Sequence, residues 1–124
     1  MIGPIKTVGI YVDDQQKAVE FYTEKLGFEV RRSVSIGPNA NWVEVAPPGA
    51  QSCLVLYPKS MMTNWPELKP SVVFYCQDVE GTCLKLDADG VRIKIKPTQL
   101  GWGMFATFLD VDDNEFGLTS QQLA

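Results

Sequence analysis

The sequence predicts an α+β protein made of two consecutive βαβββ modules, and two observations carry this prediction. Stretches typical of strands are interrupted once in each half by a stretch with helical periodicity, so the order strand, helix, strand, strand, strand occurs twice. Matching residues also recur at a nearly constant offset of 63 or 64 positions, in the pairs Tyr11 and Tyr75, Asp14 and Asp78, and Gly27 and Gly90. We expect one domain over residues 1–124, with modules at about residues 1–58 and 70–124.

The first module opens with β-branched and apolar residues at positions 5–12, as expected of a largely buried strand. Asp14 stands at the position of a helix N-cap, and Gly27 stands where a helix ends in the left-handed conformation. Between them, four apolar residues fall on one helical face: Ala18, Phe21, Tyr22 and Leu26. Three strands are then predicted, divided by turns rich in glycine and proline, at residues 28–36, 41–46 and 52–57.

A connection punctuated by Pro58, Pro66 and Pro70 leads to the second module. Its first strand is predicted at residues 71–76, followed by a helix that Asp78 caps and Gly90 ends. The apolar side of that helix is formed by Val79, Cys83 and Leu86. The last three strands are predicted at residues 91–96, 104–109 and 116–119. Because neither sheet can bury both of its faces alone, we expect the two modules to pack together.

The alternation of side chains along each strand assigns them to the two faces of the sheet. In the first strand Ile10 and Val12 suit the face that packs on the helix, and Gly9 points the other way. The same reasoning places these residues on the helix-free face: Tyr11, Trp42, Glu44, Tyr57 and Tyr75. A solvated face would be polar throughout, so this composition predicts a ligand cleft. The alternative is an interface or a second core layer.

Composition excludes several classes of function. Eleven basic against fifteen acidic residues give a net charge of −4, which argues against a nucleic-acid partner and favours a neutral or cationic ligand. No apolar run approaches the roughly 18–20 residues of a membrane span, and the first residues do not resemble a signal peptide, so we expect a cytoplasmic protein with no membrane partner. The chain has no histidine, which excludes catalytic triads and metal sites that need imidazole. The scattered Cys53, Cys76 and Cys83 are predicted to be buried thiols.

Asp13-Asp14, Ala18, Phe21-Tyr22 and Leu26-Gly27-Phe28 form a spaced pattern near the start of the chain. This pattern closely resembles the opening of the vicinal oxygen chelate superfamily, which includes glyoxalase I, bleomycin-resistance proteins and extradiol dioxygenases. Residues 110–116 resemble the family's turn before the last strand, with Val111 and Asp113 as departures. The resemblance implies an open, cup-shaped, eight-stranded mixed sheet and a homodimer. It says little about activity, because one scaffold carries unrelated chemistries.

The metal-dependent members of this superfamily carry one metal ligand on the first and fourth strands of each module. By motif, these positions fall on Thr7, Val55, Ser71 and Gly117. Their two hydroxyls, one isopropyl group and one hydrogen form no donor set for a divalent ion. We therefore expect no metal and no cofactor, and no glyoxalase, epimerase or dioxygenase activity of the usual kind.

The members that remain resemble bleomycin-resistance proteins, which implies metal-independent binding of a small drug or metabolite. Aromatic side chains suit stacking and cation–π contact with an aromatic, neutral or cationic ligand, and Glu44 suits pairing with an ammonium group. The candidate ligand-binding residues are Tyr11, Trp42, Glu44, Tyr57, Trp65, Tyr75, Trp102 and Phe105. For Trp65 and Trp102 the alternative is that they cover the core, the surface or a dimer seam.

Two other functions remain open at this point. One is a metal-free enzyme of the same scaffold, a lyase or isomerase that uses Glu44 or a cleft tyrosine as acid or base. We assign no catalytic residue, because the sequence offers no nucleophile with an activating base. The other is a structural module that binds no small ligand and acts through its surface.

Overall fold

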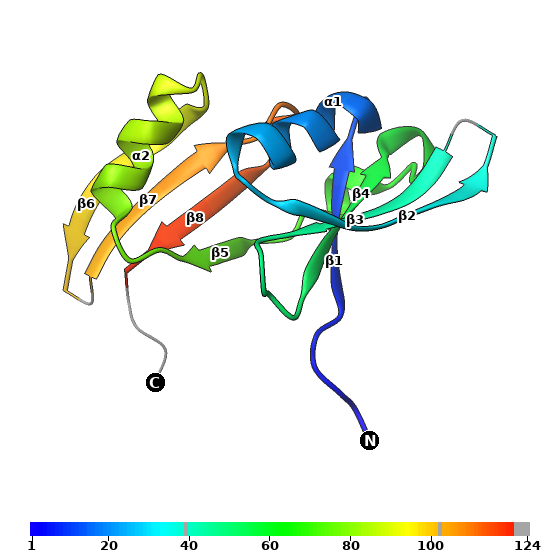
Figure 1. The fold of residues 1–124 in the computed structure, drawn as a ribbon, viewed down its shortest axis with the longest axis horizontal. Helices are drawn as coiled ribbons and strands as arrows, with labels where there is room; N and C mark the ends of the chain where they lie inside the picture. The colour runs from blue at the N-terminus through cyan, green and yellow to red at the C-terminus, as the bar shows by residue number, and fades with distance from the viewer. Residues whose placement is uncertain (39, 102, 121–124) are drawn as a thin grey trace. The chain divides into compact units, whose positions relative to one another are not determined.

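The computed structural model describes residues 1–38, 40–101 and 103–120. In this part of the chain, eight strands form two four-stranded mixed sheets, and the order βαβββ occurs twice (Figure 1). The α+β fold class and the duplicated module are therefore confirmed. The chain divides into two compact units, Met1–Pro70 and Ser71–Ala124. That the two units form one domain stays a prediction.

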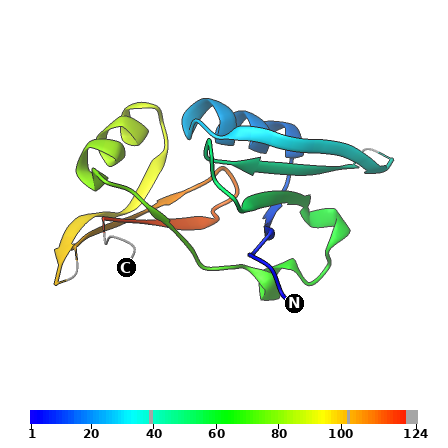
Figure 2. The same cartoon turned by 60° about the horizontal axis from the view of Figure 1, so that its bottom comes forward.

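In the first unit an α-helix lies on one face of the sheet (Figure 2). Its elements are β1 (Thr7–Val12), α1 (Gln15–Glu20), β2 (Glu29–Gly37), β3 (Ala40–Ala46) and β4 (Cys53–Pro58). The strand order is β1-β4-β3-β2, with β1 parallel to β4 and the other neighbours antiparallel. Asp14 caps α1 as predicted, because its Oδ1 accepts from the Lys17 backbone N–H at 3.1 Å. Gln15 then ties α1 to the sheet by donating to the carbonyls of Asn41 and Leu56, both at 2.7 Å.

The predicted single helix changes its winding halfway. After Glu20 the chain forms a π-helical turn over Phe21–Lys25, which the apolar pattern did not indicate. The Thr23 hydroxyl donates to the Val19 carbonyl at 2.8 Å, a local contact of the kind that competes with regular helix bonding. The turn leaves Phe21 and Tyr22 buried, and Gly27 ends it with a φ of 72°.

The second unit repeats this arrangement. Its elements are β5 (Val72–Tyr75), α2 (Val79–Ala88), β6 (Arg92–Leu100), β7 (Gly103–Leu109) and β8 (Glu115–Thr119), in the strand order β5-β8-β7-β6. Asp78 caps α2 by accepting from the Gly81 N–H at 3.0 Å, and Gly90 follows with a φ of 87°. The predicted apolar side of α2 is buried at Val79, Cys83 and Leu86. β6 ends four residues later than predicted, because a register shift between Ile95 and Thr98 carries the strand past Pro97.

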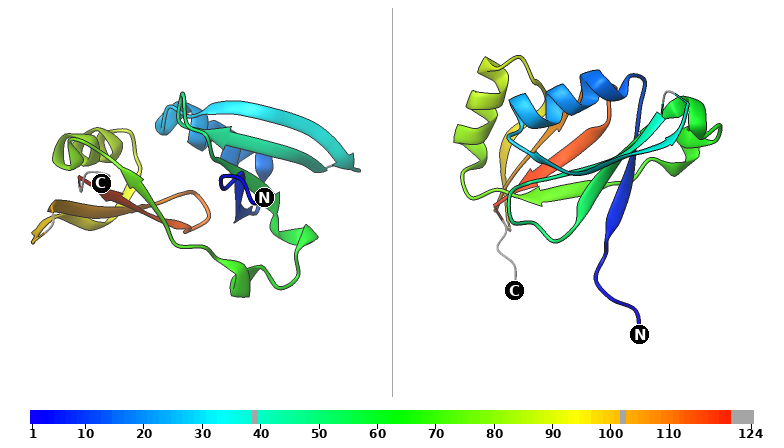
Figure 3. Two further views of the ribbon diagram at one scale, coloured as in Figure 1. Left: turned by 90° about the horizontal axis from the view of Figure 1, so that it is seen from below. Right: turned by 45° about the vertical axis from the view of Figure 1, so that its right-hand side comes forward.

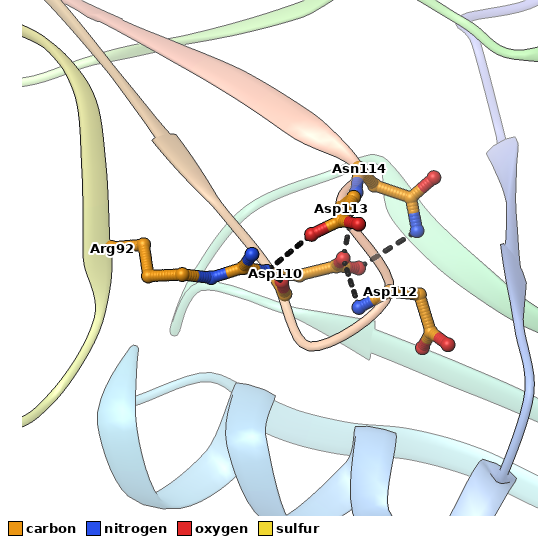
Figure 4. Close-up of polar contacts among 5 residues, drawn as sticks. All are labelled: Arg92, Asp110, Asp112, Asp113 and Asn114. Atoms are coloured by element: carbon orange, nitrogen blue, oxygen red, sulfur yellow. Dashed lines mark hydrogen bonds and ion pairs between the residues drawn. The ribbon is translucent and has the colours of Figure 1, made fainter.

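The turn before β8 is held by a buried carboxylate (Figure 4). Asp110 is 1% exposed, and its oxygens accept from the backbone N–H groups of Asp112 and Asn114 and from Asn114 Nδ2, all at 2.8 Å. Asp113 adopts a φ of 65° and forms an ion pair with Arg92 at 2.6 Å. The acidic cluster at this turn therefore shapes the backbone.

The connection between β4 and β5 is partly ordered as two short 3-10 helices, Lys59–Met61 and Trp65–Leu68 (green in Figure 3). Lys59 anchors its start, because its ammonium group forms an ion pair with Asp13 at 3.2 Å. No helix among the described residues is long and apolar enough to cross a membrane.

Candidate functional site

Three aromatic rings from three adjacent strands contact one another on the helix-free side of the first sheet; the Tyr11 residue is buried, and Trp42 and Tyr57 are half-buried. Tyr11 on β1 stacks on Tyr57 of β4, with ring centroids 5.9 Å apart and planes at 17°. Trp42 on β3 meets the same Tyr57 ring edge-on, with centroids 5.5 Å apart and planes at 87°. We call Tyr11, Trp42 and Tyr57 the aromatic face.

Gly9 allows the two tyrosine rings to lie close to the sheet. A Cβ atom at Gly9 would lie 3.4 Å from the Tyr11 hydroxyl oxygen and 3.4 Å from the Tyr57 ring. These contacts confirm that Gly9, Tyr11 and Tyr57 share the face that strand alternation assigned to them.

Glu44 lies beside Trp42 on the same face of β3. Trp42 Nε1 donates to Glu44 Oε2 at 2.7 Å, and the Glu44 residue is only 6% exposed. A buried carboxylate needs hydrogen bonds, and the indole N–H supplies one. The bond also fixes the orientation of the indole ring. Glu44 is therefore more enclosed than the sequence indicated.

Arg32 on β2 is the cross-strand neighbour of Glu44. Its side chain is exposed, and within the described part of the chain its guanidinium forms no hydrogen bond or ion pair. The guanidinium of the preceding residue, Arg31, does have partners. Arg31 is the extra residue of a β-bulge between Val30 and Arg32. Its guanidinium contacts the Glu29 carboxylate at 3.0 Å and the carbonyls of Ala50 and Pro47 at 2.8 and 3.0 Å.

The phenol of Tyr57 on the aromatic face has a raised pKa. Burial, and to a smaller degree the neighbouring Tyr11 phenol, raise the pKa of Tyr57 above its ordinary value. The phenol stays protonated at neutral pH, where it can donate a hydrogen bond.

Two of the predicted site residues that the structure describes belong to the second unit. Tyr75 on β5 and Phe105 on β7 both pair in register with Thr119 of β8, so they flank it on one face. Tyr75 is 49% exposed. Trp102, the third predicted aromatic residue of this module, lies outside the described residues.

Trp65 lies apart in the connection after β4, where its ring is engaged within the chain. Lys59 Nζ stands 4.3 Å from the ring centroid and Lys69 Nζ stands 5.2 Å from it. A cationic ligand at Trp65 would have to displace these ammonium groups, which makes Trp65 a weaker candidate than the aromatic face.

The positions at which the resemblance implies metal ligands do not fit a metal ion. Thr7 and Val55 lie on β1 and β4, and Gly117 lies on β8, where a Cβ would stand 3.0 Å from the Val73 side chain and 3.2 Å from the Phe105 ring. Ser71 precedes β5. Over residues 1–38, 40–101 and 103–120, no three His, Cys, Asp or Glu side chains are grouped to hold an ion. The three cysteines are free; Cys53 and Cys83 are buried as predicted, and Cys76 is only half-buried.

A hollow of about 640 Å³ lies on the other side of the first sheet, between α1 and the β2–β3 hairpin. Its lining includes Asp13, Gln16, Ser33, Ser35 and Val43. None of the predicted ligand-binding residues within the described ranges lines it. The hairpin extends beyond the N-terminus of α1, which leaves this side of the sheet uncovered there (Figure 2).

The sequence analysis missed Arg32, and the turn signal alone could not have found it. Gly37 pairs with Ala40 across the hairpin, so counting outward from that pair would place Ser33 opposite Glu44. A register shift just before Gly37 moves the pairing by one residue, so that Glu44 pairs with Arg32 instead. No local pattern in the sequence indicates this shift.

Comparisons with known proteins give consistent similarities. A sequence profile of the Glyoxalase/Bleomycin resistance protein/Dioxygenase superfamily matches residues 4–118. The chain is 48% identical over 116 residues to the uncharacterized protein YetH of Bacillus subtilis (strain 168), which covers 94% of this chain and 97% of YetH. TnmS3, an antibiotic binding protein from Streptomyces sp. CB03234, is similar in structure, with a TM-score of 0.82, 31% identity and 98% of each chain covered. A superfamily member from Sphaerobacter thermophilus DSM 20745 gives a TM-score of 0.85 at 31% identity, over 95% of this chain and 97% of that one.

Proposed function

We propose that this chain, which belongs to the Glyoxalase/Bleomycin resistance protein/Dioxygenase superfamily, is a binding protein for a small aromatic molecule. The observation that carries the proposal is the aromatic face, where Tyr11, Trp42 and Tyr57 meet on the helix-free side of the first sheet. The similarity to TnmS3, an antibiotic binding protein, supports it.

The aromatic face has the properties that a stacking site needs. The hydrogen bond to Glu44 holds the Trp42 ring in one orientation, so little conformational entropy is lost when a ligand stacks on it. The protonated Tyr57 phenol and the Glu44 carboxylate offer one donor and one acceptor to polar groups of the ligand. An aromatic contact contributes about 0.5–1.5 kcal/mol beyond its buried area.

Binding is proposed to be independent of a metal ion and of any cofactor. The support is chemical: Thr7, Val55, Ser71 and Gly117 offer two hydroxyls and no carboxylate, imidazole or thiolate at the positions in question. The net charge of −4 and Glu44 favour a ligand that is neutral or cationic overall. We further propose that the protein works as a homodimer.

The test is a fluorescence titration of the full-length protein with a panel of planar aromatic compounds, neutral and cationic, with and without a chelator. We expect at least one compound to bind below millimolar concentration, unaffected by the chelator, and Trp42→Ala to weaken that binding by about 3- to 10-fold. Trp65→Phe is the matched control, because its ring is engaged by Lys59 and Lys69. A folded protein that binds no member of the panel contradicts the proposal.

The alternative of a metal-free lyase or isomerase finds little support at this site. The raised pKa makes Tyr57 a poor base at neutral pH, although it remains a donor. Turnover of a bound compound that is lost in Glu44→Gln would favour this alternative.

A further inference from the structure

We propose that Arg32 and Glu44 together select a dipolar ligand, an aromatic compound that carries a cationic and an anionic group close together, as an aromatic amino acid does. This inference rests on the proposed function, since it specifies which aromatic compounds the aromatic face accepts. It identifies Arg32 as a specificity-determining residue of that site.

The sheet register places the two charges beside the rings. Trp42 and Glu44 lie two residues apart on β3, and their side chains meet in a hydrogen bond of 2.7 Å. On β2, Val34 is the partner of Trp42 and Arg32 is the partner of Glu44. Directly opposed residues have Cβ atoms about 4.5–5.5 Å apart on the same face of an antiparallel sheet. A ligand ring that lies on Trp42 is therefore within reach of both charged groups.

Neither charge is neutralised by the other in the structure. The one hydrogen bond to the Glu44 carboxylate from the described residues comes from Trp42 Nε1, which leaves its second oxygen for another donor. Arg32 is exposed, and in the described ranges its guanidinium has no hydrogen-bond or ion-pair partner. An arginine fork suits a carboxylate, and a carboxylate suits an ammonium group.

The charges that the preferred ligand carries follow from this arrangement. A cation that Glu44 attracts is repelled by Arg32 on the neighbouring strand, and an anion that Arg32 attracts is repelled by Glu44, so a ligand with a single charge gains little net energy. A ligand with both charges gains from both residues when its ammonium group faces Glu44 and its carboxylate faces Arg32. Such a ligand is neutral overall, as expected for a protein whose own net charge is −4.

The experiment uses four compounds that share one ring: indole, tryptamine, indole-3-acetate and tryptophan. They are neutral, cationic, anionic and dipolar, and their affinities for the full-length protein are measured by isothermal titration calorimetry. We expect tryptophan to bind about tenfold or more tightly than the other three. Arg32→Gln is expected to remove this preference, and Arg32→Glu is expected to reverse it so that tryptamine binds best. Lys85→Gln, which removes an exposed cation from α2, is the matched control and should leave all four affinities unchanged.

The other outcomes separate the inference from the proposed function. Equal binding of the four compounds, or a preference that survives Arg32→Glu, overturns the dipolar ligand while the aromatic site stands. Binding of the larger planar compounds without any binding of the indole series does the same. If neither set binds to the folded protein, both proposals are wrong. Arg32 is exposed, so its variants are expected to fold, which circular dichroism checks.

Discussion

At the residue scale, the stability of the buried Glu44 carboxylate depends on Trp42, because the indole N–H of Trp42 donates the hydrogen bond that this carboxylate needs. Trp42→Phe keeps an aromatic ring but removes the indole N–H that donates to the carboxylate of Glu44, a residue that is 6% exposed. We expect this substitution to lower the free energy of unfolding by about 1–3 kcal/mol in urea denaturation. The double variant Trp42→Phe/Glu44→Leu should recover part of the loss, since no buried carboxylate remains. Equal losses in both variants would contradict the coupling.

The raised pKa of Tyr57 leads to a prediction about how the free energy of unfolding depends on pH. Burial and Tyr11 raise its pKa in the folded protein above the ordinary value of 10.0, so above that pH the unfolded chain loses a proton that the folded protein keeps. The stability that Tyr57 contributes is fully present below about pH 10 and is lost as the pH rises through the folded pKa. Urea denaturation between pH 8 and pH 11 should show a smaller alkaline loss in Tyr57→Phe than in the wild type. An identical pH dependence in the two proteins would contradict it.

The two helices begin in the same way, and at the scale of elements their caps give a paired prediction. Asp14 and Asp78 each accept a hydrogen bond from a backbone N–H three residues on, at 3.1 and 3.0 Å. Asp14→Ala and Asp78→Ala should each lower the free energy of unfolding by about 1 kcal/mol. The control Asp87→Ala makes the same change inside α2, where alanine is favoured, and should cause no loss. Similar effects in all three variants would argue against capping.

Elements whose signals are local were predictable from the sequence, and irregularities between elements were not. The caps at Asp14 and Asp78 and the turns at Gly27 and Gly90 depend on one residue each, so they could be located. The π-helical turn at Phe21–Lys25 and the bulge at Arg31 depend on how the segment packs against the rest of its module.

In the candidate site, too, local features were predictable from the sequence and features that depend on strand pairing were not. Strand alternation placed Gly9, Tyr11 and Tyr57 on one face correctly, because the period of two survives wherever a strand is regular. The hydrogen bond between Trp42 and Glu44 and the exposure of Arg32 required the pairing of β2 with β3. The engagement of Trp65 by two lysines required the course of the connection after β4.

At the scale of the whole molecule, the duplicated module leads to a prediction about assembly. Each unit carries apolar side chains that are exposed on its sheet, among them Val34 and Ile36 in the first unit and Val73 and Tyr75 in the second. Contiguous exposed apolar surface favours association. We expect sedimentation equilibrium to give twice the mass of one chain at micromolar concentration. A monomer at these concentrations would contradict the homodimer.

The location of the ligand is the central claim, and nuclear magnetic resonance of the tryptophan indoles tests it most directly. The chain has three tryptophans, so the indole N–H region holds three signals that single Trp→Phe variants assign. When the tightest compound of the aromatic panel is titrated in, the account predicts that the Trp42 signal shifts with the same saturation as binding while the Trp65 signal stays in place. A saturating ligand that shifts the Trp65 signal and leaves the Trp42 signal unchanged would contradict the account.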